Sequence, residues 1–87
     1  MPLSPEVRWK GLKALQRFGP RVVPDLVRAL REEADPAVRR LAADALGRIG
    51  PAAGPARPEL VRAAVQDGDG AVRRAAARAL RAVSGQN

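Results

Sequence analysis

Residues 35–51, DPAVRRLAADALGRIGP, carry the pattern that decides the fold of this chain. Their apolar side chains recur at the three- and four-residue spacing of one helix face, at Val38, Ala42, Ala45, Leu46 and Ile49. Asp35 can cap the start of such a helix, and Pro36 suits its first turn. The Gly50-Pro51 pair ends it. The stretch therefore predicts an amphipathic α-helix with defined ends.

The same pattern occurs again on both sides of this stretch. Residues 4–20 read SPEVRWKGLKALQRFGP and residues 69–85 read DGAVRRAAARALRAVSG, and both align with 35–51 without a gap. Between them lie two shorter matching stretches, PDLVRAL at 24–30 and PELVRAA at 58–64. A repeated helix pair is the signature of a stacked helical array. We name the first type helix B and the second type helix A, so that the chain order is B-A-B-A-B.

The predicted fold class is all-α, an α-solenoid of about two and a half helical hairpins with five helices in one domain, residues 1–87. The expected helices span 5–17, 21–33, 36–48, 56–66 and 70–83. The first B helix stands alone, the second repeat covers about 21–48, and the third covers about 56–83. No β-strand is expected, because no segment alternates with period two.

Composition restricts the chemistry that this chain can perform. The sequence contains no cysteine and no histidine, which excludes disulfides, thiolate nucleophiles and acid–base catalysis by imidazole. Ser4 and Ser84 lie in the two terminal parts of the sequence, and no base is available to activate either hydroxyl. We predict that the chain is not an enzyme and uses no metal and no cofactor.

The charge is strongly positive. Sixteen Lys and Arg residues against nine Asp and Glu residues give a net charge of +7. This surplus favours a partner rich in carboxylate or phosphate, although a GC-rich genome would also produce an arginine bias. The first residues do not resemble a signal peptide, and no apolar run reaches the ~20 residues that span a bilayer. We therefore expect a cytoplasmic protein without a membrane partner.

Residues 35–50, DPAVRRLAADALGRIG, closely resemble the B helix of short bacterial HEAT repeats, the type also found in phycobilisome lyase-like proteins. The similarity extends over residues 4–85, although the repeat is shorter than the ~40–47 residues of eukaryotic HEAT arrays. The resemblance implies a right-handed superhelical stack with the B helices on its concave side. It also implies a protein that binds other macromolecules.

Members of this family place an acid five residues before the B-helix valine and a base directly after it, which forms a ladder between repeats. Glu33 and Asp67 match the acid, and Arg39 and Arg73 match the base. Arg8 has no acid at the corresponding place. The resemblance therefore implies that Arg39 and Arg73 are structural and pair with Glu33 and Asp67.

A strip of side chains projects from the B helices away from their apolar stripe. We predict that this strip binds the partner through Trp9, Lys13, Arg40, Asp44, Arg74, Arg78 and Arg81. The alternative is an ordinary solvated face, because favourable helix-dipole interactions alone place acids near helix starts and bases near helix ends. Trp9 also has a second interpretation, in which it covers the N-terminal end of the stack together with Leu12.

The leading functional hypothesis is a non-catalytic protein–protein interaction module that binds an acidic partner through the concave B-helix face. The alternative is a non-specific binder of the nucleic-acid backbone, since guanidinium groups pair well with phosphate. Aromatic residues make up only 2% of the chain, which argues against stacking on bases. A bilin-lyase-type accessory subunit is suggested by family resemblance alone. Self-association through the open ends of the solenoid is a further hypothesis.

Overall fold

The computed structural model describes residues 19–85, so the helix predicted at 5–17 lies outside the described range. Within that range the chain forms four α-helices, two 3-10 segments and no strand. Their order is η1 (Gly19–Val22), α3 (Val23–Glu32), α4 (Pro36–Ile49), η2 (Gly50–Ala56), α5 (Arg57–Gln66) and α6 (Gly70–Val83). The all-helical class is confirmed for this part of the chain, with α3 and α5 as A helices and α4 and α6 as B helices.

The B helices begin at the caps that the sequence predicts. The Asp35 carboxylate accepts a hydrogen bond from the Ala37 N–H at 2.9 Å, and Asp69 accepts one from the Val72 N–H at 3.0 Å. The A helices begin differently, because each continues directly from a 3-10 segment and has no side-chain cap. This continuity explains why α3 starts two residues later than predicted, since the preceding residues form the 3-10 turn η1.

The connection between the two repeats is part of the core. Gly50 ends α4 with φ at +73°, a left-handed conformation that glycine adopts without strain. The chain then forms η2, which contains a short insertion, because Val72 follows Val38 by 34 residues whereas Val38 follows Val7 by 31. Ala53 and Ala56 of this segment are fully buried. The insertion therefore turns the chain and also fills space between the helices.

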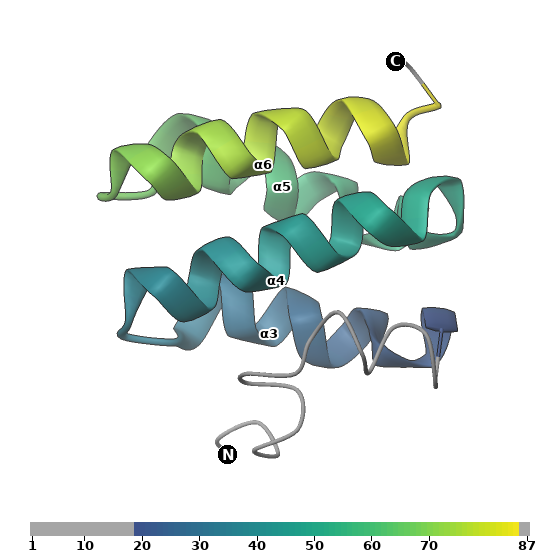
Figure 1. Ribbon diagram of the computed structural model, residues 1–87, viewed down its shortest axis with the longest axis horizontal. Helices are drawn as coiled ribbons and strands as arrows, with labels where there is room; N and C mark the ends of the chain where they lie inside the picture. Colours follow the sequence, from purple (N-terminus) through teal and green to yellow (C-terminus); the bar gives the residue numbers. More distant parts are fainter. Residues whose placement is uncertain (1–18, 86–87) are drawn as a thin grey trace.

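The four helices form two antiparallel hairpins that stack on each other (Figure 1). Helix α6 lies beside α4, and the A helices α3 and α5 form the layer behind them. The largest fully buried side chains come from all four helices and are Leu26, Leu30, Leu46, Leu60 and Val72. One apolar core therefore runs through both hairpins and the contact between them.

Small residues allow the B helices to approach closely. Ten of the 18 buried apolar residues are alanines. At the crossing of α4 and α6, a Cβ added to Gly47 would lie only 3.1 Å from the Ala79 Cα. The two backbones are thus nearly in contact, and the position of Gly47 accepts no side chain without a shift of α6.

Candidate interaction surface

A charged pair connects the two repeats beside the apolar core. The Arg39 guanidinium of α4 donates two hydrogen bonds to the Asp67 carboxylate, from Nε at 3.0 Å and from Nη2 at 3.1 Å. Its third nitrogen, Nη1, donates to the backbone carbonyls of Glu33 and Ala34, both at 2.9 Å. The planar fork of arginine suits this combination, because it binds a carboxylate in two places and still reaches the preceding turn. Arg39 therefore links the turn before α4 to the turn before α6.

Asp67 is ionised in this pair although it is only 6% exposed. Burial by itself raises the pKa of Asp67, but hydrogen bonds from Arg39 and from the Asp69 N–H, together with the charges of Arg39 and Arg62, lower the pKa below its ordinary value. The hydrogen bonding that Arg39 donates to the Asp67 carboxylate is the main cause that raises the pKa of Arg39. Both groups therefore remain charged at neutral pH.

The ladder between repeats that the family resemblance implies is present as the pair of Arg39 with Asp67. Arg39 pairs with Asp67 of the following repeat and contacts Glu33 through the backbone carbonyl of that residue. Arg73 contacts its own repeat in the same way, since its Nη1 donates to the Asp67 carbonyl at 2.7 Å. The reason is geometric: the arginine extends along the stacking direction, so the next repeat supplies the carboxylate and its own turn supplies a carbonyl.

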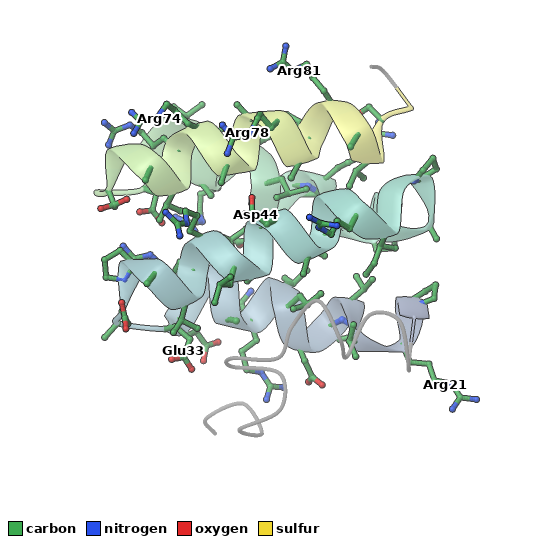
Figure 2. All side chains as sticks on the ribbon, in the orientation of Figure 1. Arg21, Glu33, Asp44, Arg74, Arg78 and Arg81 are labelled. Atoms are coloured by element: carbon green, nitrogen blue, oxygen red, sulfur yellow. The ribbon has the colours of Figure 1, made fainter. Side chains whose placement is uncertain are left out.

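Four of the predicted partner-binding residues lie on the α4 and α6 surface. Arg40, Arg74 and Arg78 are exposed, and Asp44 is half-buried. Figure 2 shows the Asp44 carboxylate on α4 pointing toward α6, the helix that carries Arg78. Trp9 and Lys13 lie outside the described residues.

An open hollow lies between α4 and α6, and we name it the α4–α6 hollow. Its lining residues are Leu41, Asp44, Gly47, Arg48, Arg78, Ala79 and Ala82. The leucine, glycine and alanines make its surface apolar, and the charged side chains stand at its rim. Gly47 and Ala79 line this hollow at the place where the backbones of the two helices approach each other closely.

The predicted strip did not include Arg48, although this residue lines the hollow. Arg40, Asp44 and Arg48 follow one another at four-residue spacing along α4, as Arg74 and Arg78 do along α6. This spacing was the available signal. Leu41 carried no such signal, because it belongs to the apolar side of the helix and only the neighbouring helix shows that it borders an open hollow.

Arg81 lies apart from the other members of the predicted strip. It lines a second hollow, between α5 and the C-terminal part of α6, together with Gly54, Arg57, Pro58, Val61, Leu80 and Ser84. Figure 2 shows its side chain pointing away from α4. In the repeat alignment Arg81 corresponds to Gly47, and this position faces along the stacking direction.

In the range 19–85 no group of three or more His, Cys, Asp or Glu side chains could hold a metal ion. None of the helices in this range is long and apolar enough to cross a membrane. The arrangement presents guanidinium groups around an apolar hollow, which suits the binding of another macromolecule.

Two stacked antiparallel hairpins joined by an arginine–aspartate ladder define a helical-repeat protein. A family model for HEAT repeats matches residues 3–81. The chain therefore belongs to the HEAT-repeat family, which confirms the resemblance seen in its B helices. HEAT repeats generally mediate protein–protein interactions, and the family is generally of a non-catalytic scaffold type. No curated protein and no solved structure matches the chain.

Proposed function

We propose that this protein is a non-catalytic interaction module that binds an acidic segment of a partner protein across α4 and α6. The observation that carries the proposal is the α4–α6 hollow, whose largely apolar lining includes Arg48 and Arg78, with Arg40 and Arg74 exposed on the same two helices. The proposal includes the predicted right-handed solenoid of five helices, in which the B helices line the concave side.

Four exposed arginines of α4 and α6, two of which line the hollow, are available for a partner. Arg40, Arg48, Arg74 and Arg78 make no hydrogen bond or ion pair with any described residue. Arg39, Arg62 and Arg73, by contrast, each bind a carboxylate or carbonyl of this protein. Folding therefore uses one set of guanidinium groups and leaves a second set on the α4–α6 surface, where carboxylates of a partner can accept from them.

Asp44 makes the expected recognition more selective than general attraction to negative charge. It stands between Arg40 and Arg48 along α4 and lines the hollow together with Arg78. A partner that fits this surface carries apolar side chains for the hollow, carboxylates for its rim, and one amide or cationic group opposite Asp44. Such a pattern of charges sets register and excludes uniformly acidic chains.

The proposal is tested with two double variants, each of which reverses the charge of two arginines, one pair on the α4–α6 surface and the other pair elsewhere. An Arg74→Glu/Arg78→Glu variant and an Arg21→Glu/Arg28→Glu variant have the same net charge, but only the first changes the α4–α6 surface. Purified protein is used to recover binding proteins from a cell extract, followed by direct titration of each recovered protein. We expect the first variant to lose its partner and the second to retain it. Equal binding by wild type and both variants would contradict the proposal.

The same four unpaired arginines favour a second candidate function, the binding of nucleic-acid backbone. Phosphate contacts of this kind are strongly salt-dependent, because each contact releases counterions. Fluorescence anisotropy with a DNA duplex at two salt concentrations distinguishes the candidates. Tight binding at low salt that collapses at higher salt and is lost in Arg74→Glu/Arg78→Glu would favour nucleic acid. Absence of binding at low salt would leave the protein partner as the better candidate.

A further inference from the structure

The α5–α6 hairpin repeats the surface on which it is itself docked. Residues of α3 and α4 that lie against the second hairpin align, 34 positions later, with residues of α5 and α6 on the opposite side of that hairpin. Ala43 is fully buried, and its equivalent Ala77 is exposed. Leu46 is fully buried, and its equivalent Leu80 is half-buried. No residue in the range 19–85 covers this surface, which we name the end face; its residues are Arg57, Val61, Val65, Arg73, Ala77, Leu80 and Arg81.

The end face carries an apolar patch. Val61 is 47% exposed and Val65 is 71% exposed, and these are the large hydrophobic side chains that the described part of the chain leaves most open. They lie one helical turn apart on α5, and Val61 borders a hollow that also contains Leu80 of α6. A patch of this kind on two adjacent helices, with arginines at its edges, is typical of a binding surface.

The end face also carries Arg73, the equivalent of the ladder residue Arg39, and Arg73 makes only part of the contacts that Arg39 makes. Arg39 uses Nη1 for the carbonyl of its own turn and Nε and Nη2 for the Asp67 carboxylate. Arg73 makes the equivalent Nη1 contact, to the Asp67 carbonyl, while its Nε and Nη2 have no partner among residues 19–85. The vacant half of the guanidinium fork is shaped for a carboxylate that approaches along the stacking direction.

Two features show that the occupant differs from another α5–α6 hairpin. Arg81 stands where Gly47 allows the close approach of α6, so an identical hairpin cannot pack as closely. Arg57, Arg73 and Arg81 make the face positive, so the same face of a second copy is repelled. The charge instead complements an acidic helix, whose apolar side covers Val61, Val65 and Leu80.

We propose that the end face binds an amphipathic α-helix of a partner protein, with a carboxylate of that helix accepting from Arg73 as Asp67 accepts from Arg39. This surface is separate from the α4–α6 hollow and faces a different direction. The protein would thereby hold two partner segments, one across its B helices and one at the end of its stack.

The probe is a fluorescein-labelled helical peptide of about 18 residues, or five turns, with Leu and Ala on one side and Glu on the other. Its control has Gln in place of every Glu. We expect the Glu peptide to bind the full chain with measurable anisotropy change, Arg73→Gln to weaken binding about tenfold, and Arg78→Gln to leave it unchanged. The exposed pair Val61→Ser/Val65→Ser should abolish binding while circular dichroism shows an unchanged helix content.

Three results would overturn the proposal. The Gln peptide could bind as tightly as the Glu peptide, or Arg78→Gln could weaken binding as much as Arg73→Gln, which would move the peptide to the α4–α6 hollow. Sedimentation could show a dimer of the free protein that Val61→Ser/Val65→Ser dissociates, which would assign the face to a second copy. Loss of this site leaves the proposed function intact, since that function is tested by Arg74 and Arg78.

Discussion

Helices α4 and α6 share one sequence pattern but occupy different environments. Helix α4 packs against α3 and α6, and α6 packs against α4 and α5, but the side of α6 that corresponds to the α6-facing side of α4 is covered by no residue in the range 19–85. Leu46 is consequently buried, whereas its equivalent Leu80 is partly exposed. Arg39 binds both a carboxylate and backbone carbonyls, whereas its equivalent Arg73 binds a carbonyl within the described residues. Equivalent residues of a repeat therefore contribute unequally to stability, because the neighbouring repeat supplies much of their burial.

The largest effect expected from this difference is on the two equivalent leucines. Leu46→Ala should lower the free energy of unfolding by about 3 kcal/mol, because it leaves a cavity in a fully buried site, and Leu80→Ala by about 1 kcal/mol. Urea unfolding followed by circular dichroism measures both values. Equal losses would show that α6 is covered in solution as completely as α4.

A slightly smaller effect is expected at the close crossing of the B helices. Gly47→Leu should destabilise the protein by about 2.5 kcal/mol, because any side chain there meets the backbone of α6 at Ala79. Arg81→Leu changes the equivalent position of the next repeat and should alter stability by no more than about 0.5 kcal/mol. Thermal unfolding of both variants provides the measurement, and tolerance of leucine at position 47 would contradict the observed approach of α4 and α6.

Substitution of Arg39 should likewise destabilise the protein more than substitution of its equivalent Arg73. Arg39→Gln should cost about 2 kcal/mol, because it leaves the buried Asp67 carboxylate without its two charge-assisted hydrogen bonds. Arg73→Gln should cost about 0.5 kcal/mol, since Arg73 is exposed and donates one hydrogen bond within the described residues, to a carbonyl. Denaturant midpoints determine the difference, and a larger loss for Arg73→Gln would mean that its guanidinium has a partner on this chain outside residues 19–85.

The smallest expected effect is on how the stability of the protein depends on pH under acidic conditions. The pKa of Asp67 is lower in the folded protein than its ordinary value of 3.8, so the unfolded chain takes up the proton first as the pH falls. The stability that this pair contributes is fully present above about pH 5 and is lost as the pH falls through the folded-state pKa. Asp67→Asn should therefore show a flatter decline of stability below about pH 5 than wild type. The matched variant Asp25→Asn keeps the pair and should retain the wild-type dependence; identical curves for both variants would refute the assignment.

Most of the local structure was predictable because local signals agree with one another. The caps Asp35 and Asp69 and the terminating Gly50 set the ends of the B helices, and the structure confirms them. The exception is the region before the A helices. There no cap marks the start, and the chain passes through a 3-10 turn whose residues also satisfy a helical pattern.

The candidate site was only partly predictable, because the position of the neighbouring helix decides which residues line the hollow. Spacing along one helix grouped Arg74 with Arg78 and also with Arg81, yet Arg81 turns toward the end face. The hollow arises because Gly47 and Ala79 meet at the crossing, and its lining by Leu41 and Arg48 follows from that contact. No periodicity within a single helix contains this information.

The sequence by itself determined the helical class, the repeat, the caps and the absence of imidazole and thiol chemistry, since these depend on residue type and on spacing within one helix. Only the tertiary structure decided which arginine binds Asp67, which arginines remain for a partner, and which side of α6 is uncovered. The physical reason is that ion pairing and burial depend on distances across the stack, and these are set by how closely α6 approaches α4.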